Sequence, residues 1–171
     1  MDKKKKFGQL YDNHLDEIYR FVFLKVSTRE VAQDITSETF RKGWEAFKNR
    51  PDMDNPRAYL YRIARNLVID HYRTKKQHIS DQEIIDELED HSKNLEDKAA
   101  ETKEMAKVKK AMENLKESYQ DIIIYKYLEE MENSEIARIM DKSEGAVRVT
   151  AHRAINALEK EMEKMKEGGN N

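Results

Sequence analysis

Residues 144–158 carry side chains whose chemistry suits the edges of DNA bases. If this stretch is a helix, with about 100° between successive residues, one of its faces is polar and basic. Arg, Asn and Thr can hydrogen-bond base edges or phosphates, and Val can touch a thymine methyl group. The face and its flanks comprise Gly145, Arg148, Val149, Thr150, His152, Arg153 and Asn156. This pattern favours DNA binding over the plain alternative, a small helical hairpin with a solvated face.

The neighbouring residues provide the elements that would position this face. Ile136 and Met140 lie at helical spacing before it. Asp141 tolerates the left-handed backbone that ends a helix, and Ser143 can cap the next helix by accepting an early backbone N–H. The sequence therefore predicts a helix-turn-helix over 131–158. Its second helix would be anchored by Val147, Ala151, Ala154, Ile155 and Leu158.

A second stretch with nucleic-acid chemistry runs from Pro56 to about residue 75. Proline suits the first turn of a helix, and here arginines alternate with tyrosines and an amide. Arg can hold phosphates, Tyr can stack on bases and Asn can read a base edge. On a helical wheel the inward face comprises Leu60, Ile63, Ala64, Leu67 and His71. The outward face and its edges comprise Ala58, Arg62, Arg65, Asn66, Ile69, Arg73, Tyr59, Tyr61 and Tyr72. Nucleic-acid binding and a solvated basic surface explain this pattern about equally well.

A row of charged residues marks the preceding helix, which we predict over about 29–48 with its cap at Ser27-Thr28. The row recurs at spacings of three and four and comprises Asp34, Glu38, Arg41 and Glu45. It suits either an ion-paired solvated surface or a docking face for a protein partner. Another apolar-faced helix is predicted over 7–26, and a loop over 49–55.

The composition excludes several classes of protein. The chain has 171 residues and no cysteine, which rules out a disulfide framework, a thiolate metal site and a cysteine nucleophile. The histidines at positions 14, 71, 78, 91 and 152 show no metal-ligand spacing, and no glycine-rich phosphate loop is present. We therefore expect no enzyme activity, no metal and no cofactor. No stretch approaches the ~20 apolar residues of a membrane span, which predicts a cytoplasmic protein without membrane insertion.

The net charge of −2 is unevenly distributed. Residues 1–76 hold 17 Lys and Arg against 11 Asp and Glu, a net of +6, whereas residues 77–107 hold 4 against 10, a net of −6. Residues 108–171 hold 11 against 13. We therefore predict an all-α fold with two small helical domains, 1–76 and 108–171, joined by a flexible acidic linker. Ile84, Ile85 and Leu88 could form a short amphipathic turn in that linker.

Three blocks of residues together carry a family resemblance, in the family's order and spacing. The blocks are Ala32–Phe40 followed by Trp44, Asn55–Leu67 followed by Asp70-His71, and Ser134–Ala137 continuing through Gly145, Val147 and His152-Arg153-Ala154. The chain resembles an extracytoplasmic-function sigma factor, the compact class of bacterial RNA polymerase specificity subunit. The resemblance covers nearly the whole chain. Ser37 departs from the family's usual Gln, Asp141 from its usual turn Gly, Lys142 from an apolar residue and Thr150 from a common basic residue.

The resemblance implies roles and partners. Asp34 and Glu38 would face the clamp helices of the polymerase largest subunit, and the second domain would meet the beta flap. The loop Arg50–Asn55 would close over a base flipped from the promoter's minus-ten strand, and Asn66 would contact it. Arg62 and Arg65 would hold the single strand. The second helix of the helix-turn-helix would enter the major groove of the minus-thirty-five element, through Arg148, Val149, His152 and Arg153. The acidic linker would run through the polymerase channel, and an anti-sigma factor would hold the protein inactive.

Two other interpretations remain at this point. A stand-alone helix-turn-helix repressor or activator would need a dimer interface or a ligand pocket, and the sequence shows neither clearly. A helical enzyme lacks support in the residues. Binding to core RNA polymerase separates the sigma-factor interpretation from the stand-alone regulator.

Overall fold

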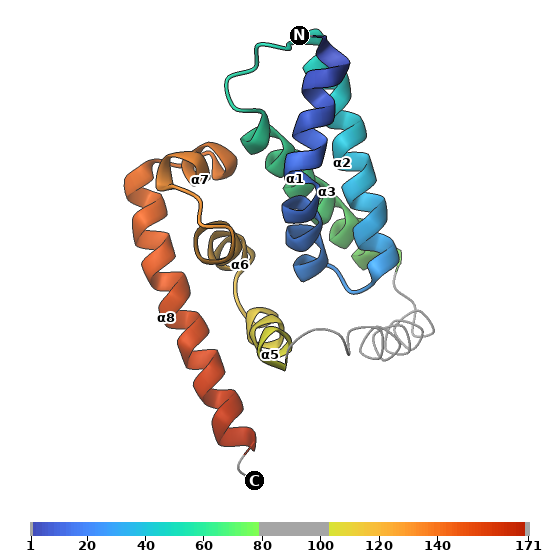
Figure 1. Ribbon diagram of the computed structural model, residues 1–171. Coiled ribbons are helices and arrows are strands. Elements are labelled where there is room, and N and C mark those ends of the chain that lie inside the picture. Colours follow the sequence, from blue (N-terminus) through green and yellow to red (C-terminus); the bar gives the residue numbers. More distant parts are fainter. Residues whose placement is uncertain (1, 79–102, 170–171) are drawn as a thin grey trace. The chain divides into compact units, whose positions relative to one another are not determined.

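The computed structural model describes residues 2–78 and 103–169, and all regular structure in these two ranges is helical (Figure 1). The chain divides between Lys98 and Ala99 into two compact units. Each unit is described by itself below. The described residues contain no helix that is long and apolar enough to span a bilayer.

In the first unit, the described residues form a bundle of three helices that pack against one another pairwise (Figure 1). They are α1 (Lys3–Lys25), α2 (Arg29–Asn49) and α3 (Pro56–His78). The three predicted helices are confirmed, and so is the cap of α2, because Thr28 Oγ1 accepts the Val31 N–H at 3.1 Å. Helix α1 begins four residues before the predicted residue 7. Lysine is a good helix former, and Lys3 Nζ donates to the Lys48 carbonyl at 3.1 Å, which ties this end to α2.

Helix α3 buries a wider arc than predicted because it packs against both α1 and α2. Leu60 and Ala64 lie in the core as expected. The prediction that Ala58 faces outward and Tyr61 sits at an edge is wrong, since both are buried. The Tyr61 ring lies 5.8 Å from that of Phe21 on α1. The other two edge tyrosines reach the surface: Tyr59 is half-exposed, and Tyr72 is exposed and donates its hydroxyl to the Lys25 carbonyl.

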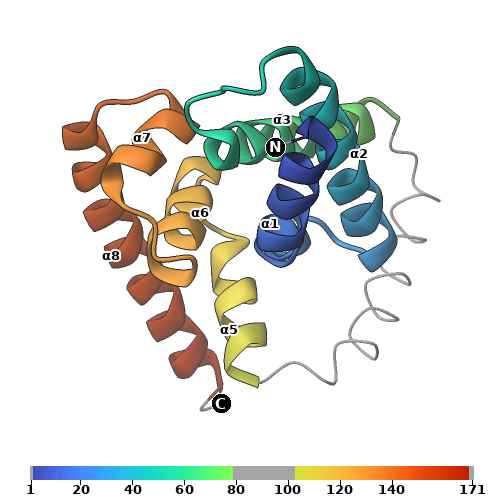
Figure 2. The ribbon, with the colours of Figure 1, turned by 45° about the horizontal axis from the view of Figure 1, so that its top comes forward.

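The second unit contains α5 (Lys103–Met112), α6 (Glu117–Ile123), the π-helix η2 (Ile124–Leu128), α7 (Asn133–Met140) and α8 (Glu144–Gly169). Helices α5, α6 and α7 all pack against α8 (Figure 2). Helix α5 begins at Lys103, five residues before residue 108, where the second helical domain was predicted to begin. Lys, Glu, Met and Ala in this first turn and a half favour helix without supplying an apolar stripe. The suggested turn at Ile84, Ile85 and Leu88 lies outside the described residues.

The apolar run at 122–128 supports the helix-turn-helix over its first four residues. Ile122, Ile123, Ile124 and Tyr125 are buried, whereas Tyr127 and Leu128 are 43% and 39% exposed. The run ends in a π-helix whose Glu129 N–H bonds the Ile124 carbonyl at 2.9 Å, five residues earlier. This widened turn changes the phase of the helix, which explains why the last two apolar residues face outward.

The close approach of α2 and α3 generates the first testable prediction. A Cβ built on Gly43 would lie 2.6 Å from Leu60 Cδ2, and Leu60 is only 2% exposed. Gly43→Ala should therefore lower the free energy of unfolding by about 1–3 kcal/mol, the usual range for overpacking a core. The measurement is denaturant unfolding followed by the fluorescence of Trp44, the single tryptophan of the chain.

Gly8→Ala is the matched control, because a Cβ on Gly8 would meet nothing within 4 Å. This change should leave stability unchanged or raise it by up to about 1 kcal/mol through helix propensity. Equal effects of the two substitutions would refute the close-packing argument.

Candidate nucleic-acid interface

The turn between α7 and α8 has the geometry that the sequence predicted. Asp141 ends α7 in the left-handed conformation, with φ 55° and ψ 51°. The Lys142 N–H then bonds the Ala137 carbonyl at 3.0 Å, which satisfies a carbonyl at the helix end. Ser143 Oγ accepts the Ala146 N–H at 3.1 Å and caps α8. The three-residue turn and its flanking helices confirm the helix-turn-helix.

Helix α8 presents one buried and one exposed face. The buried residues are Val147, Ala151, Ala154 and Leu158, as predicted, while Ile155 is only half-buried. Of the predicted contact residues, Gly145, Arg148, Val149, His152, Arg153 and Asn156 are exposed, and Thr150 is half-buried at the flank. Val149 is 50% exposed within this polar face. An exposed face of mixed hydrogen-bonding groups and one methyl-bearing side chain matches what a major groove offers.

The exposed arc of α3 carries the second set of predicted residues. Arg62, Asn66 and Arg73 are exposed. Tyr59, Arg65 and Ile69 are half-exposed on the same helix. Tyr61 does not belong to this set: with 0% exposure its ring cannot stack on a base, which corrects the prediction that it contacts DNA. The arc combines cations, an amide and an apolar side chain.

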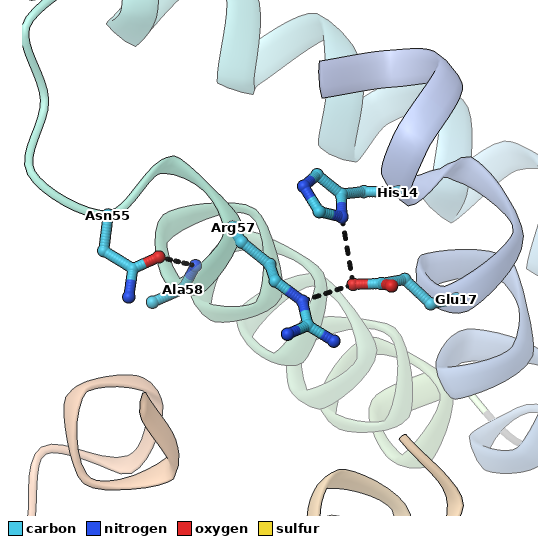
Figure 3. A network of polar contacts seen from close by, with 5 residues as sticks. All are labelled: His14, Glu17, Asn55, Arg57 and Ala58. Atoms are coloured by element: carbon cyan, nitrogen blue, oxygen red, sulfur yellow. Dashed lines mark hydrogen bonds and ion pairs between the residues drawn. The ribbon is translucent and has the colours of Figure 1, made fainter. Parts of the chain in front are cut away.

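The loop before α3 is held at both ends by hydrogen bonds. At its start, the Arg50 N–H bonds the Ala46 and Phe47 carbonyls at 3.1 Å each. At its end, Asn55 Oδ1 accepts the Ala58 N–H at 3.0 Å and so caps α3 (Figure 3). The predicted DNA contact Asn55 therefore uses its carbonyl oxygen within the protein, which leaves the amide N–H groups as its donors to any ligand.

A polar network next to this loop was missed by the sequence reasoning. Glu17 on α1 accepts hydrogen bonds on one oxygen, Oε1, from Arg57 Nε at 2.6 Å and from His14 Nδ1 at 3.2 Å (Figure 3). Burial alone would raise the pKa of the Glu17 carboxyl, but the bonds from His14 and Arg57 outweigh it, and the pKa lies below its ordinary 4.5. Glu17 and Arg57 are 40 positions apart, so no local spacing pattern could reveal the pair.

The charged row on α2 is largely paired along the helix. Arg41 holds both oxygens of Glu38, at 2.8 and 2.6 Å, and Lys48 pairs with Glu45 at 2.9 Å. The hydrogen bond from Arg41 lowers the pKa of the Glu38 carboxyl. Asp34 is exposed one turn earlier. Such exposed pairs contribute little to the stability of the fold. A partner that binds the row could therefore break them at a small cost in free energy.

Among the residues of both described ranges, no group of three or more His, Cys, Asp or Glu side chains is placed to hold a metal ion.

Family models match both helical units. The model described as Sigma-70 region 2 matches residues 10–78, and the model described as Sigma-70, region 4 matches residues 105–158. The ECF RNA polymerase sigma factor BldN of Streptomyces coelicolor is 33% identical over 159 residues, which are 89% of this chain and 58% of BldN. The chain belongs to the extracytoplasmic-function sigma factors. Sigma factors direct RNA polymerase to promoters and catalyse no reaction themselves, so this sigma factor is a transcription initiation factor and not an enzyme.

The match to two other relatives covers a larger share of their length than the match to BldN does. The ECF sigma factor SigW of Bacillus subtilis is 29% identical, with 91% of this chain and 88% of SigW covered. SigX of the same organism is 25% identical, with 94% of this chain and 86% of SigX covered. The fold also resembles that of RpoE of Bartonella quintana, solved with the anti-sigma factor NepR, at a TM-score of 0.72 and 18% identity over 93% of this chain and 98% of that one. CnrH, solved with the cytosolic domain of CnrY, matches with a TM-score of 0.67 and 20% sequence identity. The match covers 94% of this chain and 90% of CnrH.

The Glu17 network predicts a specific loss of stability in acid. Because the pKa of Glu17 is lower in the folded chain than its ordinary 4.5, its contribution is complete above the unfolded pKa and disappears as pH falls through the folded pKa. Unfolding of Glu17→Gln and of the unchanged protein, followed by Trp44 fluorescence, should therefore differ at pH 7, and the difference should shrink as the pH falls through the lowered pKa of Glu17. A constant difference across this range would show that the charge of Glu17 contributes nothing.

Proposed function

We propose that this sigma factor opens and reads the minus-ten promoter element with its first unit and reads the minus-thirty-five element with its second. The observation that carries the proposal is that each unit leaves one cation-bearing, hydrogen-bonding helix face exposed, on α3 and on α8. The domain limits 1–76 and 108–171 and the acidic linker 77–107 remain part of the proposal. We also propose that the protein acts in the cytoplasm, where bacterial RNA polymerase works.

In the first unit, the loop Arg50–Asn55 and the exposed arc of α3 would bind the unwound strand. Flipping a base out of the duplex costs a few kcal/mol, which contacts in the protein must offset. Asn66 is the exposed amide on the arc and would read the flipped base. The remaining residues would hold the backbone or pack against bases: Tyr59, Arg62, Arg65, Ile69 and Arg73. Tyr61 has no part in this contact because it is buried.

In the second unit, the exposed face of α8 would lie in the major groove. Arg148 and Arg153 can bond guanine or a phosphate, and Asn156 can bond adenine. Val149, with half of its side chain exposed, would contact a thymine methyl group. Thr150 and His152 would complete the contact.

Two faces would meet the polymerase. The row Asp34, Glu38, Arg41 and Glu45 on α2 would dock on the clamp helices of the largest subunit, and the second unit would meet the beta flap. Of the two solved structures named above, RpoE was solved with the anti-sigma factor NepR, and CnrH was solved with the cytosolic domain of CnrY. This supports an anti-sigma factor as a further partner of this chain.

The direct test is co-purification of the full chain with bacterial core RNA polymerase, followed by run-off transcription on fragmented host DNA. Stable association with discrete new transcripts is the expected result, and it would also supply promoter sequences. Specific duplex binding by the free protein without polymerase association would instead indicate a stand-alone regulator.

The minus-ten assignment predicts that Asn66→Ala lowers promoter opening by roughly tenfold, since one base-edge contact is worth about 1–3 kcal/mol. Permanganate reactivity of unpaired thymines in the assembled complex measures opening. Polymerase affinity should not change. Thr74→Ala, an exposed position two turns along α3, is the control, and unchanged opening in Asn66→Ala would refute the pocket.

The polymerase assignment predicts that Asp34→Arg with Glu38→Arg weakens core binding by about tenfold or more, because like charges across an interface cost several kcal/mol. Fluorescence anisotropy with labelled sigma factor measures the affinity. The control reverses the charge of two exposed acidic residues on α1, through Asp12→Arg with Asp16→Arg. Affinity that is unchanged by the α2 variant, or lowered equally by both, would leave the row as a solvated surface.

A further inference from the structure

Helix α1 carries none of the residues assigned to DNA or polymerase, yet one of its side chains reaches the promoter-melting region. The Glu17 side chain is 14% exposed, and its oxygen Oε1 lies 2.6 Å from Arg57 Nε. Arg57 is the second residue of α3 and follows the loop Arg50–Asn55 almost directly. Figure 3 shows the arginine side chain leaving the first turn of α3 and pointing at Glu17. One charge-assisted hydrogen bond thus joins α1 to the end of the loop.

Arg57 is held on more than one side. Its guanidinium carbon lies 5.9 Å from the centroid of the Tyr61 ring, within cation–π distance. Tyr61 is itself fully buried and packs edge-on against Phe21 of α1. The same Glu17 oxygen also accepts from His14 Nδ1 at 3.2 Å. A carboxylate can only accept, so His14 carries its proton on Nδ1 in this contact.

This arrangement gives Arg57 a different task from the exposed arginines of α3. Arg62 and Arg73 point to solvent and can reach phosphates. The Arg57 side chain is three-quarters buried, and its guanidinium forms an ion pair with Glu17. The neighbouring Asn55 caps the same helical turn through Ala58. The direction in which the loop enters α3 therefore depends on both contacts, one local and one reaching to α1.

We propose that Glu17 is a positioning residue for promoter opening: through Arg57 it holds the first turn of α3, and with it the loop Arg50–Asn55, in the conformation that receives the flipped base. The proposal rests on the minus-ten site proposed above and deepens it. Glu17 touches no DNA itself. Its removal should reduce binding of the unwound strand while leaving contacts made by α2 and α8 unchanged.

Single-stranded DNA provides the sharpest test, because its binding requires no duplex melting. The holoenzyme is assembled with each variant and titrated with a labelled oligonucleotide carrying the non-template minus-ten strand, from a promoter found by run-off transcription. The temperature is kept well below unfolding of every variant. We expect Glu17→Ala to weaken this binding about tenfold, the equivalent of 1.4 kcal/mol, and to lower thymine reactivity in the duplex promoter similarly. Core affinity should be unchanged.

A double-mutant cycle tests whether the effect of Glu17 on strand binding passes through Arg57. If Glu17 acts through Arg57, then Glu17→Ala combined with Arg57→Ala should be no worse than the poorer single variant. Glu17→Gln keeps an oxygen acceptor and adds little strain, so it replaces Glu17→Ala in this test if that variant folds poorly. We expect Glu17→Gln to weaken binding of the oligonucleotide about threefold. Asp16→Asn removes a neighbouring exposed charge on α1 as the matched control. Additive single effects would overturn the route through Arg57.

The outcomes separate this proposal from the one on which it rests. Weaker strand binding with Asn66→Ala but unchanged binding with Glu17→Ala and Glu17→Gln would overturn the positioning role alone. Unchanged binding in all three would overturn the minus-ten site itself. Equal losses of strand binding and core affinity in the Glu17 variants would assign Glu17 to general stability of the first unit, which also overturns the proposal.

Discussion

The close contact between α2 and α3 determines which side chains of α3 remain available. Gly43 provides the room, because its missing Cβ leaves space for the Leu60 side chain. With α2 on one side and α1 on another, α3 buries Ala58, Leu60, Tyr61, Ala64 and Val68. Only one arc is then left, and it contains Arg62, Asn66 and Arg73. The set of polar side chains that this helix exposes is thus a consequence of core packing, because a helix covered by two neighbours has little freedom in what it exposes.

The second unit reaches a comparable result through backbone geometry. Asp141 accepts a left-handed conformation that costs most residues free energy, and this allows α7 to stop where Ser143 can start α8. The buried residues 122–125 then support the anchored face of α8. A second non-glycine residue with positive φ, Glu130 at 53°, lies just after the π-helix. Both unusual conformations occur in connections between helices, Glu130 between η2 and α7 and Asp141 between α7 and α8.

Local patterns in the sequence were sufficient for the helices, the caps at Thr28 and Ser143 and the polar face of α8, because each depends on residues within a few positions. Tyr61 shows where such reasoning fails: its place in the core depends on Phe21, in another helix. The Glu17–Arg57 pair spans 40 positions and has no periodic signature. The π-helix at 124–128 changes the helical phase within an apolar run, so the run alone could not indicate that Tyr127 faces outward. Long-range contacts decided the first two points, whereas the third depends on a local but unusual backbone hydrogen bond, from the Glu129 N–H to the Ile124 carbonyl.

The charge distribution explains why such a protein would depend on polymerase to find DNA. Non-specific affinity for duplex DNA grows with the number of phosphates neutralised by Lys and Arg. Among the proposed contact residues of α8 the permanent cations are Arg148 and Arg153, and residues 108–171 carry a net of −2, with 11 basic against 13 acidic residues. On α3, Arg57 is already engaged with Glu17. Two weak DNA contacts become strong only when both act at once, since the first raises the effective concentration of the second. A polymerase that binds both units would provide that coupling, and weak contacts in the free protein would limit binding to DNA away from promoters.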